Sequence, residues 1–215
     1  RMSYYLVEIE PVAGTNTKVS DILSTVEQVV TSNTANDSLK FKVFGENKFL
    51  FIGQGEEPQK VLDALNDQGN IANAINVKTV PVRPYEDFGR EVLGIDKAIT
   101  ERSTRAFSDP QTVLFIRITI DFPGLGMEEF LKIWKEEATF GFTARSQAVM
   151  DFRAFKTIAT RSVILIMNLP AAEIIDTGLH AAPFAMNPKT ADGFRFPEVR
   201  ELKQLPGKGS KSAQL

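Results

Sequence analysis

The sequence predicts an α+β fold in which two β-α-β-β-α-β units follow one another, over residues 1–88 and 112–205. Some segments alternate apolar and polar residues, as half-buried strands do, and others repeat apolar residues every three or four positions, as one face of a helix does. Both kinds of segment occur in the same order in each half of the chain. Residues 89–111 are largely polar and predict a linker, and the small, polar and basic residues 206–215 predict a disordered tail.

The first unit begins with a clear strand pattern, because Tyr5, Val7 and Ile9 fall on one side of the segment YYLVEIEP. Its second helix is predicted to begin at Pro58, since proline at the first helical position loses no intrahelical hydrogen bond. In this unit, strands are predicted at residues 4–11 and 75–82 and a hairpin at 39–44 with 48–53. Helices are predicted at residues 19–30 and from Pro58 onward.

The second unit repeats this plan. Leu114, Ile116 and Ile118 alternate with polar or aromatic neighbours in its first strand, and Phe130 and Trp134 belong to one apolar stripe of its first helix. In this unit, strands are predicted at residues 112–123 and 193–202 and a hairpin at 152–157 with 161–168. Helices are predicted at residues 127–140 and from Pro170 onward.

The β-α-β-β-α-β order is the ferredoxin-like arrangement, an antiparallel sheet covered by helices on one face. The other face of such a sheet must be covered or solvated. Charged residues stand among the apolar ones on the first strands, notably Glu8 and Arg117. If two sheets pack face to face, these two residues could form an ion pair.

Composition excludes several classes of function. The formal net charge of -2 provides no basic field that would attract nucleic acid or an anionic membrane. The longest apolar run, residues 163–167, is far shorter than a membrane-spanning helix. The chain has no cysteine, so a disulfide framework and a thiolate nucleophile are absent. We therefore predict a cytoplasmic protein that binds neither nucleic acid nor membranes.

Four segments between residues 112 and 203 resemble the dimeric α/β barrel superfamily, a ferredoxin-like group, and most nearly its muconolactone isomerase-like branch. They are DFP at 121–123, FLKIWKEEA at 130–138, ILIMNLPAAEIID at 164–176 and LHAAPFAM at 179–186. Members of this superfamily form a barrel from two identical chains. A tandem copy therefore implies an intramolecular pseudo-dimeric α/β barrel, either as a monomer or within a further homo-oligomer.

The resemblance leaves the activity open. The superfamily includes isomerases, polyketide cyclases, cofactor-free monooxygenases, haem-handling enzymes and proteins without known catalysis. Because one fold supports many functions, function must be argued from the site.

Two residues are the candidates for catalysis. His180 is the only histidine, and a neutral imidazole can exchange a proton near pH 7. Glu137 lies one turn beyond Trp134 and precedes the aromatic stretch FGF, so it could flank a pocket. Together they would supply a base and an acid for proton transfer. The alternatives are a helix-end histidine bonded to backbone or solvent, and a glutamate on a solvated helix face.

Aromatic residues are concentrated in the second half and predict a pocket for a small hydrophobic or aromatic molecule. Arg117 and Arg145 could hold a carboxylate or enolate, although salt bridges within the barrel would use them equally well. The predicted ligand-binding residues are Phe115, Arg117, Trp134, Phe140, Arg145, Phe184 and Met186.

The leading hypothesis is binding of such a molecule, with cofactor-free proton transfer of the isomerase or cyclase type if the protein is an enzyme. A non-catalytic binding or assembly module is the alternative, and haem binding through His180 is a third. A metal site is not predicted, because one histidine and no cysteine leave too few nitrogen and sulfur ligands. Gly124-Leu125-Gly126 lacks the third glycine of a dinucleotide fingerprint, so no cofactor is predicted.

Overall fold

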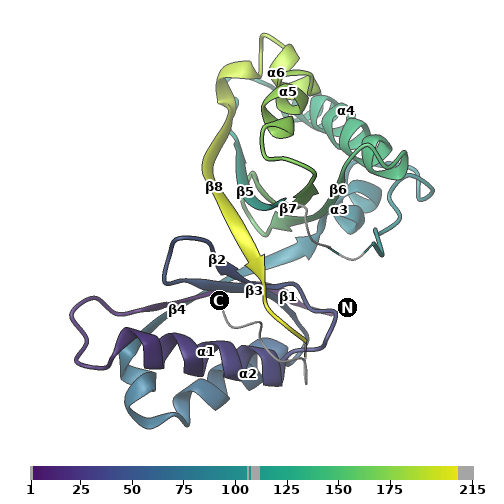
Figure 1. Cartoon of the computed structure of the whole chain (residues 1–215). Coiled ribbons are helices and arrows are strands. Elements are labelled where there is room, and N and C mark those ends of the chain that lie inside the picture. The colour runs from purple at the N-terminus through teal and green to yellow at the C-terminus, as the bar shows by residue number, and fades with distance from the viewer. Residues whose placement is uncertain (1, 106, 108–111, 208–215) are drawn as a thin grey trace. The chain divides into compact units, whose positions relative to one another are not determined.

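The computed structural model describes residues 2–105, 107 and 112–207 (Figure 1). Part of the predicted linker and most of the predicted tail therefore lie outside the described residues. The chain forms two compact units: unit 1 extends to Val82 and resumes at Leu202, and unit 2 comprises Arg83–Glu201. The predicted domain limits at residues 88 and 112 remain a prediction about which segments fold independently.

Unit 1 is an antiparallel sheet with its helices on one face (Figure 1). The strands lie in the order β4-β1-β3-β2, and Val7 pairs with Phe51 on one side and Thr79 on the other. Its elements are β1 (Tyr4–Pro11), α1 (Val19–Asn33), β2 (Lys40–Val43), β3 (Phe49–Gln54), α2 (Glu57–Asn66), the 3₁₀ turn η1 (Gly69–Ala74) and β4 (Ile75–Pro84).

The core of unit 1 forms because the apolar stripes predicted from the sequence face each other. Val7 and Phe51 from the sheet pack with Ile22 and Val26 of α1 and with Val61 of α2. Proline stands in the first turn of α2, as expected. This core is separate from the candidate site described below, which lies entirely in unit 2.

Unit 2 has the same order of strands, β8-β5-β7-β6, and α4 to α6 lie on one side of its sheet (Figure 1). The α+β class is confirmed, and the element order in each unit matches the predicted one. The elements are α3 (Tyr85–Glu91), β5 (Thr112–Ile120), α4 (Met127–Ser146), β6 (Asp151–Thr157), β7 (Ser162–Leu169), α5 (Ile174–His180), α6 (Pro183–Met186), the 3₁₀ turn η2 (Ala191–Gly193) and β8 (Phe194–Gln204).

Three boundaries differ from the predicted ones. Helix α4 continues to Ser146, because Phe142 and Arg145 extend its buried stripe beyond residue 140. Helix α5 begins at Ile174 and not at Pro170. Helix α3 begins at Tyr85, directly after β4, and ends at Glu91, so it crosses the predicted boundary between the first unit and the linker. Here the residues of the first predicted domain and of the linker form one helix that packs into unit 2.

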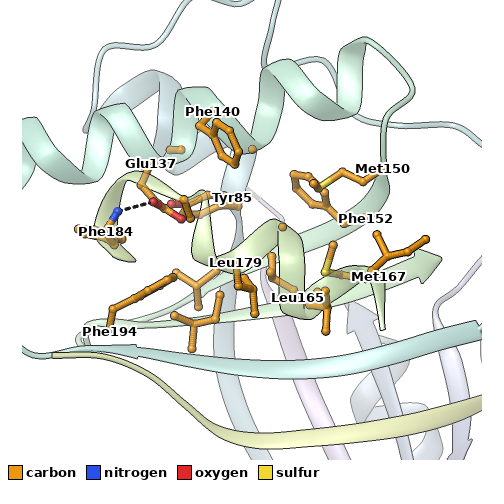
Figure 2. A pocket seen from close by; sticks show the side chains of 18 of the residues that line it. Tyr85, Glu137, Phe140, Met150, Phe152, Leu165, Met167, Leu179, Phe184 and Phe194 are labelled. Atoms are coloured by element: carbon orange, nitrogen blue, oxygen red, sulfur yellow. Dashed lines mark hydrogen bonds between the residues drawn. The ribbon is translucent and has the colours of Figure 1, made fainter. Parts of the chain in front are cut away.

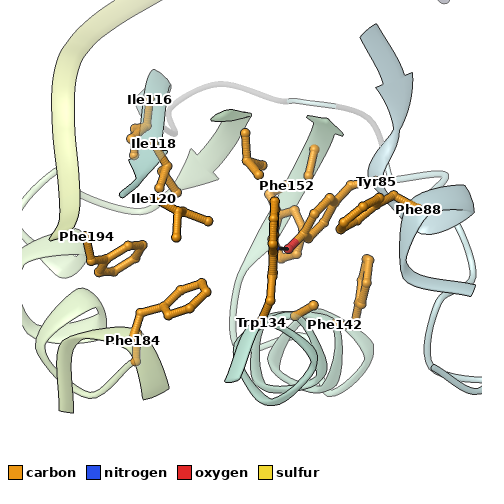
Figure 3. Packing of buried hydrophobic residues seen from close by; sticks show 14 of the residues in the cluster. Tyr85, Phe88, Ile116, Ile118, Ile120, Trp134, Phe142, Phe152, Phe184 and Phe194 are labelled. Carbon is orange, nitrogen blue, oxygen red and sulfur yellow. Dashed lines mark hydrogen bonds between the residues drawn. The ribbon is translucent and has the colours of Figure 1, made fainter. Parts of the chain in front are cut away.

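Aromatic side chains dominate the core of unit 2 (Figure 3). The Phe88 ring of α3 lies 4.9 Å from that of Trp134 in α4, and the Tyr85 ring lies 5.5 Å from that of Phe142. Such tilted ring pairs add to the stabilisation from apolar burial. Helix α3 is therefore fixed against α4 by its own aromatic residues, which places Tyr85 in the interior.

A buried ion pair reinforces the same contact. Arg145 of α4 is only 3% exposed and donates a hydrogen bond of 2.7 Å from Nη1 to Glu86 Oε1 of α3. Its guanidinium also lies 5.0 Å and 4.8 Å from the ring centres of Phe142 and Phe152. Its Nη2 donates to the carbonyl of Glu101. Arg145 thus joins α3, α4 and β6, and its charge is already neutralised.

In the described part of the chain, no helix is both long and apolar enough to cross a membrane. The predicted cytoplasmic location remains a prediction.

Candidate ligand-binding pocket in unit 2

Unit 2 contains a cavity of about 310 Å³ between its sheet and helices α4 to α6 (Figure 2). This volume is at the lower end of the range found for small-molecule pockets. The lining is overwhelmingly apolar, with aromatic, aliphatic and methionine side chains. The lining residues are Tyr85, Ile118, Ile120, Glu137, Ala138, Phe140, Gly141, Val149, Met150, Phe152, Val163, Leu165, Met167, Leu169, Ile174, Ile175, Thr177, Gly178, Leu179, Ala182, Phe184 and Phe194.

Regular secondary structure places these side chains. On β7, Val163, Leu165 and Met167 line the floor because every second residue of a strand points to the same face. On α4, Glu137 and Gly141 line the cavity one turn apart, as residues four positions apart do. The pocket is therefore a gap between a rigid sheet and a long helix.

Helix α5 forms part of the wall, and only its partly buried Ile175 packs against the core of unit 2 among its described residues. Ile174, Ile175 and Leu179 line the cavity, yet no residue of α5 is buried. Exposed apolar side chains, Phe140 and Val149 together with Ile174, also belong to the lining. Contiguous exposed apolar surface of this kind is typical of a ligand entrance.

Glu137 is the only carboxyl group among the lining residues. Its Oε2 accepts a hydrogen bond of 2.8 Å from the backbone N–H of Phe184 (Figure 2). The sequence explains this contact. Pro183 begins α6, and the N–H groups of the first turn of a helix have no partner within that helix. The carboxylate of Glu137 thus satisfies a backbone donor and fixes α6 to α4.

Burial raises the pKa of Glu137 from 4.5 to about 7, and the hydrogen bond from Phe184 opposes this shift only in part. Glu137 forms no ion pair with any described residue, and its lining neighbours include no lysine, arginine or histidine. An uncompensated carboxylate in apolar surroundings favours the neutral form. Near pH 7, Glu137 therefore exists in both protonation states.

Tyr85 and Thr177 are the other polar side chains of the lining. The hydroxyl oxygen of Tyr85 accepts a hydrogen bond of 2.7 Å from Nε1 of Trp134 (Figure 3). Burial, and secondarily the charge of Glu137, raises the pKa of Tyr85 well above its usual range. Tyr85 therefore stays protonated, and it lines the same cavity as Glu137.

Three of the residues predicted from the sequence line the pocket, namely Glu137, Phe140 and Phe184. Phe115 and Trp134 are buried but do not line it, although Trp134 holds Tyr85. The two catalytic candidates are therefore not brought together, because His180 is absent from the lining.

The position of His180 follows from the geometry of α5. The helix turns Gly178 and Leu179 toward the cavity, and His180, the next residue, lies exposed at its end. Met186 is likewise 70% exposed and lies outside the lining. The structure thus places both residues on the surface of unit 2.

The two arginines predicted to bind a ligand have protein partners instead. Nε of Arg117 donates a hydrogen bond of 3.0 Å to Glu198. The suggested pair with Glu8 remains a prediction. Arg145 pairs with Glu86 as described above. Neither arginine lines the pocket. Arg117 and Arg145 therefore form salt bridges within the protein, which was the alternative to ligand binding.

Sequence reasoning missed Tyr85, Met150 and Met167. Tyr85 lies near the end of the first predicted unit, after its last predicted strand, and no local pattern connects it with α4. Met150 and Met167 both line the cavity. Nothing in the sequence around them distinguishes a residue of a cavity wall from a residue of the packed core. The alternation of residues 161–168 does place Met167 on the same strand face as Val163, which was the one available signal.

The sequence matches no family model and no curated protein. Solved structures do match. A mutant chlorite dismutase from Candidatus Nitrospira defluvii in complex with cyanide has a TM-score of 0.58 at 9% identity, over 95% of this chain and 91% of that chain. The chlorite dismutase of the same organism in complex with imidazole has a TM-score of 0.54 at 9% identity, over 95% and 92% of the two chains. At such identities the likeness shows the fold alone.

Proposed function

We propose that unit 2 binds a small, predominantly apolar molecule in this pocket, and that Glu137 exchanges a proton with it. The observation that carries the proposal is an apolar cavity with one carboxyl group whose pKa is about 7. Apolar walls with a few placed polar groups are how proteins usually hold small molecules. A general base is most effective when its pKa lies near the working pH.

The pocket favours neutral ligands over anions. No lysine, arginine or histidine belongs to the lining, so a bound carboxylate or phosphate would lack a counter-charge and would face Glu137. Moving an unpaired charge from water into an apolar site costs on the order of several kcal/mol of binding free energy. The ligand class is therefore a hydrophobic or aromatic molecule without an acidic group.

Titration with naphthalene tests binding, because Trp134 is the only tryptophan and its indole is bonded to the pocket residue Tyr85. We expect a saturable change in fluorescence at pH 7. Gly141→Leu places a side chain in the cavity and should weaken binding at least about tenfold. Gly126→Leu is the matched control, since Gly126 is exposed and a Cβ added there would meet no atom within 4 Å. Unchanged affinity in Gly141→Leu would contradict binding in this pocket.

A non-catalytic binding module is the alternative that shares the same pocket. It needs only the apolar walls, whereas proton transfer also needs the carboxyl group of Glu137. Glu137→Gln keeps the side-chain shape and an oxygen that can accept the Phe184 N–H. If turnover of any substrate that binds the pocket survives in Glu137→Gln, the carboxyl group is not the base.

Haem binding is the second candidate. The superfamily resembled by residues 112–203 includes haem-handling enzymes, and two of the matching structures are chlorite dismutases in complex with cyanide and with imidazole. The residues of the pocket do not fit a haem ligated by histidine, because His180 is exposed and the lining has no histidine. Tyr85 could be an axial ligand only by leaving its bond to Trp134. Titration with haemin should give no saturable Soret band; a band that persists in His180→Ala would support haem at another residue.

The pseudo-dimeric barrel implied by the resemblance is part of the same proposal. Its support is the strand order, fourth-first-third-second, which is the same in both units. A chain that contains its own pseudo-dimer is complete as a monomer. Light scattering should therefore give the mass of one chain, 23.9 kDa, and a larger mass would indicate a further homo-oligomer.

A further inference from the structure

Tyr85 and Glu137 are two of the three polar side chains that line the pocket, with Thr177 as the third. We call Tyr85 and Glu137 the polar corner of the pocket (Figure 2). They come from different helices, α3 and α4, and no hydrogen bond joins them in the structure. Both side chains nevertheless line the same cavity, so one ligand can contact both. The corner therefore presents two separate polar groups to one ligand.

Each of the two groups makes one hydrogen bond within the protein and keeps one further hydrogen-bonding function for a ligand. Glu137 uses Oε2 for the N–H of Phe184, and among the described residues no donor reaches Oε1. The Tyr85 oxygen accepts from Trp134, and no described residue accepts its hydroxyl proton. The available functions are thus one carboxylate oxygen, an acceptor or base, and one hydroxyl proton, a donor.

We propose that this corner enolises a hydrophobic ketone, with Glu137 as the base and Tyr85 as the hydrogen-bond donor to the carbonyl oxygen. This inference rests on the proposed function and deepens it, since it names the substrate class and a further catalytic residue. A ketone matches the corner because it is neutral, it accepts one hydrogen bond, and it carries a C–H bond next to the acceptor.

The step balances without a cofactor. Oε1 of Glu137 takes a proton from the carbon next to the carbonyl group. The C–H electron pair becomes a carbon–carbon double bond, and the carbonyl π electrons move to the oxygen, which the Tyr85 hydroxyl stabilises. The protonated Glu137 then returns the proton to the same carbon or, in a conjugated substrate, to a more distant carbon. The first outcome exchanges hydrogen with solvent, and the second moves a double bond.

Trp134 is the positioning residue of this arrangement. It does not line the pocket, but its N–H occupies a lone pair of the Tyr85 oxygen and so leaves the hydroxyl to act as a donor. The bond also orients the phenol, because Trp134 is held between Phe88 and Phe130 at centroid distances of 4.9 Å and 5.2 Å. A donor fixed before the reaction contributes more than one that must reorient.

The test uses 2-tetralone, a bicyclic aromatic ketone, and naphthalene, a hydrocarbon of the same ring size that lacks the oxygen. Exchange of the 2-tetralone α-hydrogens in D₂O is followed by NMR with the full-length protein. We expect exchange above the buffer rate, a loss of about 10²-fold or more in Glu137→Gln, and a loss of about 10²-fold in Tyr85→Phe. Tyr5→Phe, in unit 1, is the matched control and should exchange at the wild-type rate.

Trp134→Phe tests the positioning role of Trp134. It is also a second measurement in case Tyr85→Phe misfolds, since that variant leaves the indole N–H of Trp134 without its partner. Trp134→Phe keeps the Tyr85 hydroxyl and should lower exchange less than Tyr85→Phe does. Naphthalene affinity, measured by calorimetry, should stay within about twofold in all these variants, because it reports only the apolar walls.

The outcomes separate the two levels of the proposal. If naphthalene does not bind wild-type protein, the proposed function itself fails. If naphthalene binds but 2-tetralone exchange equals the buffer rate, ketone enolisation is overturned while ligand binding stands. If exchange is enhanced and Tyr85→Phe retains it in full, Tyr85 is not the donor.

Discussion

Replacing Glu137 by glutamine should stabilise the protein at alkaline pH and leave its stability nearly unchanged in acid. The substitution removes the charge but keeps an oxygen for the N–H of Phe184, which Glu137 accepts at 2.8 Å. It therefore isolates the cost of an ionised carboxyl group in an apolar cavity. That cost is what a functional carboxyl group here would impose on the fold.

The sign follows from the pKa of Glu137, which is 4.5 when exposed and about 7 in the folded protein. Between these values the folded state binds more protons than the unfolded state, so the free energy of unfolding falls as the pH rises. One pKa unit corresponds to about 1.4 kcal/mol, and the full loss above pH 7 is therefore about 3 kcal/mol. Glu137→Gln avoids this loss.

Urea denaturation of both proteins at pH 4.5, 6, 7 and 8 measures the difference. Glu137→Gln should exceed the wild type by about 3 kcal/mol at pH 8 and by less than about 1 kcal/mol at pH 4.5. Lys156 also titrates in this range, because burial lowers its pKa to about 8, but it is present in both proteins and cancels in the difference. A difference that does not change with pH would refute the reasoning.

Three substitutions test the packing around the site, each by denaturant unfolding. Gly193→Ala should destabilise the protein by about 3 kcal/mol, since its new Cβ would overlap the carbonyl oxygen of Asp121; wild-type stability would contradict the observed chain approach. Gly141→Ala should stabilise the protein by about 0.5–1 kcal/mol, because alanine favours the helix and its Cβ would meet only an ordinary contact at 3.7 Å. Glu86→Gln should cost about 3 kcal/mol by leaving the buried charge of Arg145 without its counter-ion, and the double variant with Arg145→Met should recover part of this loss.

The comparison of His180 with Glu137 shows why sequence reasoning located only part of the site. His180 is a catalytic candidate by sequence because it is the only histidine, but this says nothing about the direction of its side chain. Successive residues of a helix differ by about 100° in direction, so Leu179 faces the cavity while His180 is exposed. Glu137 was chosen for its place between Trp134 and an aromatic stretch, a property of one continuous helix, and it does line the pocket.

Local periodicity by itself determined the α+β class and the order of elements in each unit, because strands and helices each impose a repeat on their own residues. The concentration of aromatic residues in the second half predicted a pocket with apolar walls, and the lining is predominantly apolar. Only the tertiary structure decided which polar groups share the pocket. Tyr85 lines the same cavity as Glu137 because α3 packs on α4 through long-range aromatic contacts. Arg117 and Arg145 are unavailable because they pair with Glu198 and Glu86 from other elements. These contacts depend on packing between segments that are far apart in the chain, and the residue pattern within one segment does not predict such packing.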